Sequence, residues 1–439
     1  MTIQTLLMSS ALMGATLAQA PIPHVPIRMV RPAPAPAPAP APAVAPVVPI
    51  ASSETRAIDL VLCLDTSNSM DNLIQSARQH LWSIVNEMAT LKPQPELRVA
   101  LLAYGSPAYG SAQGFVRVAT ELTGDLDLVS QRLFELKTNG GQEYVARAVL
   151  TSLTSLKWSD DPNALKMIVV AGNEAATQDP AHPVEEVAKQ AIERGILINT
   201  VFCGGKQTPV AEGWRAVAQR ADGQFMAIES AQLAVIETPF DAQLASLSKE
   251  LNGTYLVYGR SRTQWASNQV LQDSNASHLN TAAAALRCQT KGSALYFNPS
   301  YDLVDACKDV KFDLTKIAVA ELPEVLRGKS VAEQKAHIAR MTKKRAGIQK
   351  QVADIGRKRK LFVIKEQHRL GESNQNSFEK AMLRSVRAQA AARGFERKPA
   401  PKPAGAEQKP APKPKEAPPV AGEKQVQLEI VLPPRQPLR

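Results

Sequence analysis

Five consecutive residues, Asp65-Thr66-Ser67-Asn68-Ser69, combine one carboxylate with two serine hydroxyls at alternating positions. On a tight turn that leaves a strand, side chains two residues apart converge, so Asp65, Ser67 and Ser69 can share one ion. Mg²⁺ prefers about six oxygen ligands and keeps some waters. One negative charge under-neutralises such an ion, which can then accept a carboxylate from a partner. Because no adjacent His, Lys or second carboxylate in the sequence supplies a general base, the loop predicts binding rather than catalysis.

The segments around this loop predict an α/β fold with a doubly wound, mostly parallel, six-stranded sheet. An almost continuous apolar run, 58–64, ends at Asp65, as expected of a strand buried on both faces. Strands and helices alternate along the chain, which favours a parallel sheet with its ligand site beyond the carboxyl ends of the strands. The further strands are predicted at 97–104, 115–120, 167–171, 196–202 and 223–228, and the helices at 73–91, 126–136, 145–156, 184–194 and 214–221.

In this setting the Asp-x-Ser-x-Ser loop resembles the metal-ion-dependent adhesion site of von Willebrand factor A (vWA) domains, over roughly residues 56–250. The resemblance implies a divalent cation, Mg²⁺ or else Mn²⁺ or Ca²⁺, and a protein partner bound at the same face. In the family, a Thr in a second loop and an Asp in a third loop complete the site. This sequence departs at both positions, with Gln142 in place of the Thr and Gly172 in place of the Asp.

Oxygen-bearing side chains next to the two altered positions are candidates to rebuild the site. Glu143 or Glu174 would supply the missing carboxylate, directly or through water. The alternative is a degenerate site that no longer holds a metal. The complete set of candidate metal ligands is Asp65, Ser67, Ser69, Gln142, Glu143, Asn173 and Glu174.

The rest of the chain is predicted to form four further parts. Residues 1–20 indicate a cleaved export signal, because an apolar run ends in Ala18-Gln19-Ala20, although no Lys or Arg precedes it. The mature protein is then periplasmic or secreted and has no transmembrane segment. The other three parts are a Pro/Ala-rich linker at 21–55, which precedes the vWA domain at 56–250, a helix-rich C-terminal domain at 251–396 and a disordered basic Pro/Ala/Lys tail at 397–439. Within the C-terminal domain we expect a strand at 254–259, helices at 265–287, 331–352 and 377–393, and a basic segment at 353–370. The segments 251–259, 272–276 and 301–306 are similar to a bacterial subgroup of exported vWA proteins with a conjoined C-terminal region.

The four cysteines have no zinc-site spacing. Cys63 and Cys203 are expected on strands separated by a third strand, on the order of 10 Å apart, which is too far for a disulfide. A disulfide between Cys288 and Cys307 remains open. Asp302 and Asp305 are interpreted as helix-capping residues, and the scattered histidines, His80 among them, are expected at the surface.

Positive charge is concentrated near the C-terminus. The chain has a net charge of +11, and residues 327–395 hold 18 Lys and Arg against 5 Asp and Glu. Such a region indicates an anionic surface or polymer as a partner, or else a solvated helical face. The basic run 343–360 has no interleaved aromatic residues, so no nucleic-acid partner is expected.

These features favour a non-enzymatic, exported binding protein whose vWA domain makes metal-dependent protein–protein contacts. The alternative is an envelope scaffolding protein whose vWA site is degenerate and metal-free. A hydrolase, or the metal-insertion subunit of an ATP-driven complex, is disfavoured, because the sequence has no G-x-x-x-x-G-K-[ST] loop and no acid–base pair.

Overall fold

The computed structural model of the chain describes three stretches, residues 56–228, 236–369 and 378–397. The predicted signal at 1–20, the linker at 21–55 and all but the first residue of the predicted tail at 397–439 lie outside the described residues. Within the described stretches, no helix has the length and apolar character needed to cross a bilayer.

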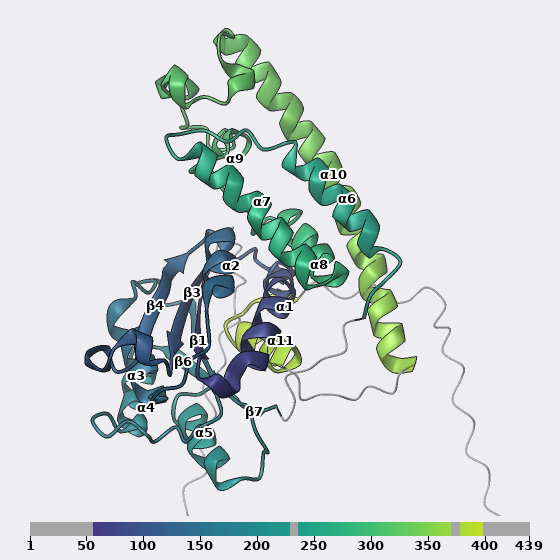
Figure 1. The fold of residues 1–439 in the computed structure, drawn as a ribbon. Helices are drawn as coiled ribbons and strands as arrows, with labels where there is room; N and C mark the ends of the chain where they lie inside the picture. The colour runs from purple at the N-terminus through teal and green to yellow at the C-terminus, as the bar shows by residue number, and fades with distance from the viewer. Residues whose placement is uncertain (1–55, 229–235, 370–377, 398–439) are drawn as a thin grey trace, which may run out of the picture. The chain divides into compact units, whose positions relative to one another are not determined.

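A six-stranded sheet forms the centre of the vWA region (Figure 1). The strand order is β4-β3-β1-β5-β6-β7, and only β4 runs antiparallel to its neighbour. The predicted fold class is therefore confirmed. Because β1 lies between β3 and β5, the strand order reverses at the end of β1. The strands are β1 (Ala57–Asp65), β3 (Glu96–Tyr104), β4 (Val116–Thr123), β5 (Leu165–Gly172), β6 (Ile196–Phe202) and β7 (Phe225–Ala227).

Helices cover both faces of the sheet, which explains why β1 is apolar on both sides. Leu62 and Leu64 belong to the core on one face, whereas Val61 and Cys63 belong to the core on the other. The exception is Asp59, which is fully buried and accepts hydrogen bonds from Arg98 at 2.7 and 2.8 Å. The helices are α1 (Asp71–Met88) and α2 (Leu126–Glu135) on the first face, and α3 (Val145–Ser155), α4 (Val184–Glu193) and α5 (Pro209–Arg220) on the second.

The last helix, α11 (Phe378–Ala392), returns to the sheet although it lies within the predicted helix-rich domain (Figure 1). Its buried residues Met382 and Val386 join the core that α1 covers. Asn199 of β6 and Gln389 of α11 exchange hydrogen bonds at 2.7 and 2.9 Å. The short strand β8 (Glu396–Arg397) then pairs with β2 (Leu91–Lys92). The C-terminal end of the described chain is thus part of the vWA core.

The intervening region is helix-rich, as predicted, but its elements differ in detail. The expected strand at 254–259 is only an isolated bridge between Val257 and Asp302. The expected helix at 265–287 is broken at Asn280, whose extended backbone and side chain cap the following helix. The two predicted charged segments at 331–370 form one continuous helix of 39 residues. The helices are α6 (Asp241–Asn252), α7 (Arg262–Leu279), α8 (Thr281–Lys291), α9 (Leu303–Ala306) and α10 (Val331–Arg369).

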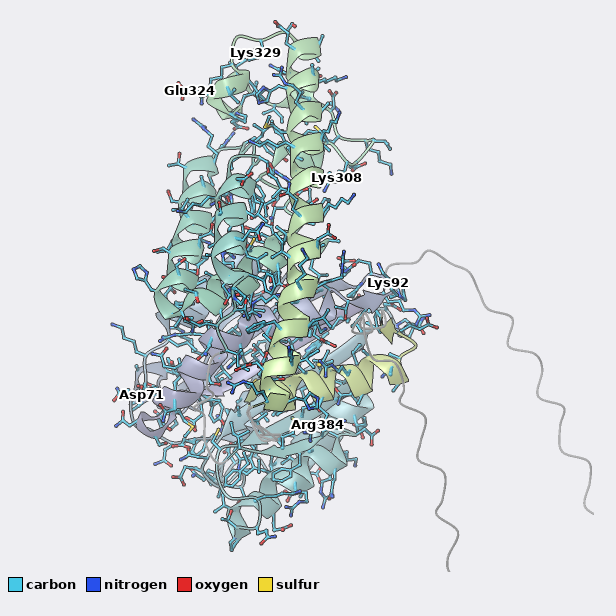
Figure 2. The ribbon with its side chains drawn as sticks, turned by 90° about the vertical axis from the view of Figure 1, so that its right-hand side faces the viewer. Asp71, Lys92, Lys308, Glu324, Lys329 and Arg384 are labelled. Atoms are coloured by element: carbon cyan, nitrogen blue, oxygen red, sulfur yellow. The ribbon has the colours of Figure 1, made fainter. Side chains whose placement is uncertain are left out.

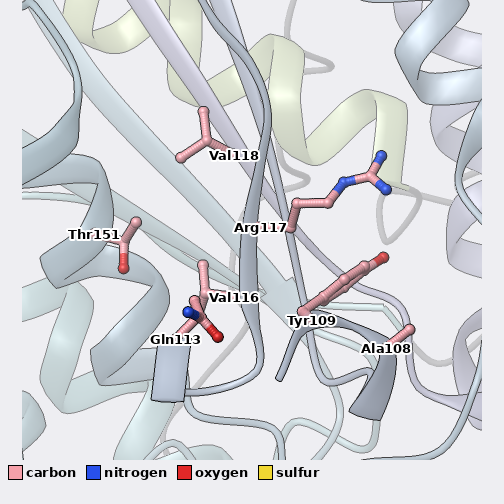
Figure 3. Close-up of a pocket in the computed structure, with 7 residues that line it drawn as sticks. All are labelled: Ala108, Tyr109, Gln113, Val116, Arg117, Val118 and Thr151. Atoms are coloured by element: carbon pink, nitrogen blue, oxygen red, sulfur yellow. The ribbon is translucent and has the colours of Figure 1, made fainter. Parts of the chain in front are cut away.

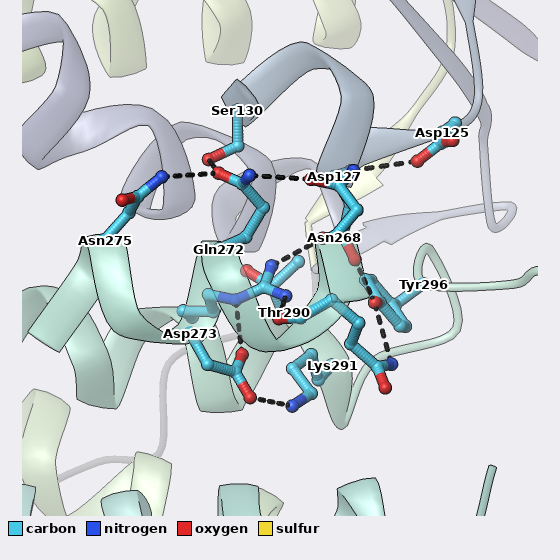
Figure 4. A network of polar contacts seen from close by, with 12 residues as sticks. Asp125, Asp127, Ser130, Asn268, Gln272, Asp273, Asn275, Thr290, Lys291 and Tyr296 are labelled. Atoms are coloured by element: carbon cyan, nitrogen blue, oxygen red, sulfur yellow. Dashed lines mark hydrogen bonds and ion pairs between the residues drawn. The ribbon is translucent and has the colours of Figure 1, made fainter. Parts of the chain in front are cut away.

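A buried polar network joins this helical region to α2 of the vWA region (Figure 4). Arg287 of α8 is fully buried and forms ion pairs with Asp127 at 2.7 Å and with Asp273 at 2.6 Å. Lys291 pairs with Asp273 at 2.8 Å, and Tyr296 donates to Asp127 at 2.5 Å. Each charge in this network therefore has a partner of opposite sign. We refer to these five residues as the interface network.

The structure answers one open question about the cysteines, corrects the expectation for His80 and adds a second contact to the capping residue Asp302. All four cysteines are free, and Cys288 is buried while Cys307 is exposed, so the two do not form a disulfide. His80 is buried rather than exposed, because α11 covers it and places Glu379 at 3.4 Å. Asp302 caps α9, as interpreted, and it also forms a buried ion pair with Arg345 of α10 at 2.6 Å.

Candidate functional site

The Asp65–Ser69 loop leaves β1 at the point where the strand order reverses. Asp65 is fully buried, and its Oδ1 accepts the backbone N–H of Ser67 at 2.8 Å. The hydroxyls of Ser67 and Ser69 lie 3.2 Å apart, and Ser69 donates to Oδ1 of Asn173 at 3.3 Å. The loop thus turns back on its own carboxylate and brings Asp65, both serines and Asn173 to one place.

Glu143 enters the same site from the loop before α3. Its side chain is 7% exposed and lies beside Asp65. Oδ2 of Asp65 and Oε2 of Glu143 are both buried without a hydrogen-bond partner. The sequence shows no second carboxylate next to the loop, but the fold provides one.

The pKa values of Asp65 and Glu143 are set mainly by burial, because no cationic side chain in the described part of the chain offsets it. Burial, the largest cause, and the neighbouring carboxylate of Asp65 together raise the pKa of Glu143 to about 8. Burial likewise raises the pKa of Asp65. Among the described residues, no Lys, Arg or His forms an ion pair with either carboxyl group. Two acidic groups therefore share a buried position that has no cation.

Two glycines make room for the carboxylates. Gly105 follows β3 with a φ of +83°, and a Cβ there would lie 2.7 Å from Oδ1 of Asp65. At Gly172, a Cβ would lie 2.4 Å from the hydroxyl of Tyr104 and 3.0 Å from Oδ2 of Asp65. Tyr104 donates to the carbonyl of Ala171 at 2.9 Å. Tyr104 therefore occupies the space into which an Asp at position 172 would extend.

The other predicted residues lie farther from the two carboxylates. Gln142, at the position where the family has Thr, is exposed, and the next residue, Glu143, points inward instead. Glu174 is also exposed and accepts a hydrogen bond from Gln178 at 3.4 Å. Its negative charge nevertheless contributes to the raised pKa of Asp65 and Glu143. The structure thus brings together five of the seven predicted residues and leaves Gln142 and Glu174 at the rim.

Sequence reasoning missed the residue that fixes the loop. Thr66 is fully buried, and its hydroxyl donates to the carbonyl of Tyr104 at 2.8 Å. Its own carbonyl accepts the N–H of Asn139 at 2.8 Å. Thr66 therefore joins the loop after β1 to the end of β3 and to the loop that carries Glu143. The useful signal was the polar Thr directly after an apolar strand.

A surface groove of about 530 Å³ runs beside this loop along the edge strand β4 (Figure 3). Tyr109 lines it, and the Tyr109 hydroxyl lies 3.2 Å from that of Thr66. The guanidinium of Arg117 stands 5.5 Å from the centre of the Tyr109 ring. Neither Asp65 nor Glu143 lines the groove, so the carboxylate pair does not stand at the base of this groove.

The residues present fit a hard divalent cation. Such ions take carboxylate, hydroxyl and amide oxygens, which are the donors of Asp65, Glu143, Ser67, Ser69 and Asn173. In the described part of the chain, no cluster of three or more His, Cys, Asp or Glu has metal-binding geometry. A mixed set of two carboxylates with neutral oxygens is therefore the relevant donor set. The two orphaned carboxylate oxygens are the structural feature that calls for a cation.

Comparison with known proteins agrees with this fold. Residues 59–240 match the family model of the von Willebrand factor type A domain. The chain therefore contains a vWA domain. None of the curated proteins matches the chain.

Several solved structures also resemble the chain, with a TM-score near 0.3. Proximal thread matrix protein 1 from the mussel byssus is 13% identical over 40% of this chain and 43% of that one, with a TM-score of 0.32. A von Willebrand factor type A protein from Catenulispora acidiphila is 16% identical over 40% and 39%, with a TM-score of 0.32. The pilus adhesin SpaC from Lactobacillus rhamnosus GG is 14% identical over 40% and 28%, with a TM-score of 0.31. The match spans less than half of each of these chains.

Proposed function

We propose that this chain is an exported, non-enzymatic binding protein whose vWA loops bind a protein partner in a divalent-metal-dependent manner. The observation that carries the proposal is the buried pair Asp65 and Glu143, with two carboxylate oxygens that lack a partner. Such burial is costly unless a cation compensates it. Mg²⁺ fits the donor set, with Mn²⁺ and Ca²⁺ as alternatives.

In this proposal Asp65, Ser67, Ser69 and Glu143 hold the cation, and Asn173 orients Ser69. A bound divalent cation supplies an electrophilic position that a carboxylate of the partner can occupy. Thr66 fixes the loop, and the exposed Gln142 and Glu174 are placed to contact the partner or a metal-bound water. In the same proposal, the basic helix α10 meets a second, anionic partner.

A binding role is favoured over catalysis by the surroundings of the pair. A carboxyl group with a pKa raised to about 8 could act as a general base. However, the side chains around the pair, Ser67, Ser69 and Asn173, offer neutral oxygens, which suit a bound cation better than an acid–base reaction. Export is supported only by the sequence of residues 1–20.

The test is capture of partners from an extract of the native host by the immobilised full chain. We expect proteins retained in Mg²⁺ to be released by EDTA and to be absent when Asp65→Ala is the bait. Asp59→Asn is the matched control, because it disturbs the same strand through the buried Arg98 pair but leaves the loops intact. Binding that is insensitive to EDTA and to Asp65→Ala would contradict the proposal.

The scaffolding alternative makes the opposite prediction. If the vWA domain is a rigid module tethered by its tails, Asp65→Ala has no effect on partner capture. Deleting 21–50 or 397–439 then abolishes it.

A further inference from the structure

Helix α10 runs along the whole length of the helical region (Figure 2). It carries a line of positive charge on its solvent-facing side. Nine of its Lys and Arg side chains are exposed, and we call eight of them, all except Lys335, the basic ridge. At 100° per residue they fall within an arc of about 140°, on the side of the helix away from its buried residues. At 1.5 Å per residue they extend over about 44 Å. The basic ridge consists of Arg340, Lys343, Lys344, Lys350, Arg357, Lys358, Lys365 and Arg369.

The buried side of α10 fixes which way the ridge points. Ile348 and Val352 pack in the core that α10 shares with α6 and α8. Arg345 is buried and pairs with Asp302, and Arg359 is buried and pairs with Asp241 at 2.7 Å. Apart from the exposed Lys335 and the half-buried Lys360, the basic residues of α10 therefore divide into two groups. Those that face the bundle have carboxylate partners, and the ridge faces solvent.

The charge of the ridge is only partly neutralised. Arg357 and Arg369 pair with Asp354 and Glu366 on the same helix. Within the described residues, the five lysines of the ridge form no ion pair. Apart from Lys344, which is next to Lys343, they recur along the helix at intervals of seven or eight residues, which is about two turns. The opposite wall of the bundle differs, since Arg262 is the one Lys or Arg in α7. The positive charge is thus one-sided and available.

The chemistry of the ridge indicates the kind of partner. Among the described residues, six ridge cations have no ion pair, and five of these are lysines while the sixth is Arg340. Lysines act as hydrated point charges, whereas specific phosphate recognition favours bidentate arginines. Between Arg340 and Lys358 no large hydrophobic side chain is exposed, so this stretch does not insert into a bilayer or stack on bases. A straight, one-sided row of lysines is suited to a flat surface that carries mobile negative charges.

We propose that the basic ridge docks the protein, by charge alone, on a bilayer surface that contains anionic phospholipids. The ridge and the candidate metal site are on different elements, so the two proposals can fail separately. Docking requires no ordered headgroup pocket, and it weakens with salt because screening shortens the range of exposed charges to about 8 Å at physiological ionic strength.

The test is co-sedimentation of the full chain with vesicles of phosphatidylcholine containing phosphatidylglycerol, compared with vesicles of phosphatidylcholine alone. We expect binding only to the anionic vesicles, and loss of binding in high salt. The variant K343Q/K344Q/K350Q/K358Q should bind roughly a hundredfold more weakly, since each surface lysine contributes several-fold. The matched control, K157Q/K189Q/K206Q/K249Q, removes four exposed lysines from elsewhere and should bind like the unchanged protein.

Asp65→Ala and EDTA should leave vesicle binding unchanged, which separates this proposal from the metal-dependent function. Circular dichroism of the ridge variant verifies that it folds. The proposal is overturned if the unchanged protein does not bind anionic vesicles, or if the ridge and control variants bind equally. It is also overturned if soluble polyphosphate binds the ridge while vesicles do not.

Discussion

Two groups of buried charge in this molecule differ in one respect, which is whether their carboxylates have cations. In the interface network, Asp127 and Asp273 contact Arg287, and Asp273 also contacts Lys291 (Figure 4). In the candidate site, Asp65 and Glu143 contact each other and no cation. The carboxylates of both groups are mostly buried, so burial alone does not distinguish them.

The pKa directions express this difference. Burial tends to raise the pKa of Asp273, but Arg287 and Lys291 outweigh it and hold that pKa below its ordinary value. Burial raises the pKa of Asp65 and Glu143, and nothing outweighs it. Buried carboxylates that are paired with cations fix how two regions of the molecule join. Buried carboxylates without such a partner mark a position where a cation from solution stabilises the protein.

The largest effect is expected from breaking the paired group. Arg287→Ala leaves Asp127 and Asp273 buried without their main cation and should lower the free energy of unfolding by about 3–5 kcal/mol. Chemical denaturation followed by tryptophan fluorescence measures this change. Arg132→Ala, which breaks an exposed pair with Glu135, is the control and should cost at most about 1 kcal/mol. Equal losses in the free energy of unfolding for the two variants would contradict the special contribution of the buried ion pairs.

Removing one charge from the unpaired group should stabilise the protein, whereas breaking the paired group destabilises it. In EDTA at pH 9, Glu143→Gln should raise the free energy of unfolding by about 1–3 kcal/mol, because a buried carboxylate without a partner is lost. The pKa of Glu143 is raised from 4.5 to about 8. The contribution of protonated Glu143 to the free energy of unfolding is therefore fully present below pH 4.5 and is lost as the pH rises through about 8.

The gain from Glu143→Gln should accordingly disappear as the pH falls toward 4.5. Thermal denaturation at a series of pH values, always with the unchanged protein beside the variant, measures it. Glu121→Gln removes an exposed carboxylate of β4 and should show no such pH-dependent gain. A Glu143→Gln variant less stable than the unchanged protein at high pH would mean that the pair is compensated in metal-free protein.

The smallest effect is expected at the residue that fixes the loop. Thr66→Val keeps the side-chain volume but removes the 2.8 Å hydrogen bond to the carbonyl of Tyr104, which should cost about 1 kcal/mol. The variant should also respond less to added metal, because the loop is held less firmly. Melting curves with and without Mg²⁺ report both effects, and an undiminished metal response would show that Thr66 does not position the loop.

Local patterns were enough to predict the sheet and its loop. The apolar run 58–64 and the Asp that follows it place the site at the end of β1 without any knowledge of distant contacts. Which of Gln142 and Glu143 points inward could not be predicted, because a shift of one residue in a loop exchanges the two. The role of Tyr104 could not be predicted either. Its hydroxyl extends from β3 past β1 to the carbonyl of Ala171 on β5, and this contact depends on the strand order, which the sequence does not show.

Contacts between residues that are far apart in the sequence could not be predicted either. Arg287 and Asp127 are 160 residues apart, and no spacing rule connects them. The same holds for α11, whose amphipathic pattern predicts a helix but not the sheet on which it packs. The basic ridge could be predicted in part. The excess of positive charge is visible in the sequence, but its position on one side of α10 follows only from the burial pattern of that helix.

The measurement that tests the central claim most directly is a melting curve of the full chain at increasing Mg²⁺ or Mn²⁺, with Asp65→Ala beside it. A ligand that binds only the folded protein raises its stability with concentration. We predict that millimolar metal raises the melting temperature of the unchanged protein by several degrees and that Asp65→Ala abolishes the shift. An unchanged melting temperature at millimolar Mg²⁺ and Mn²⁺ would contradict the metal site.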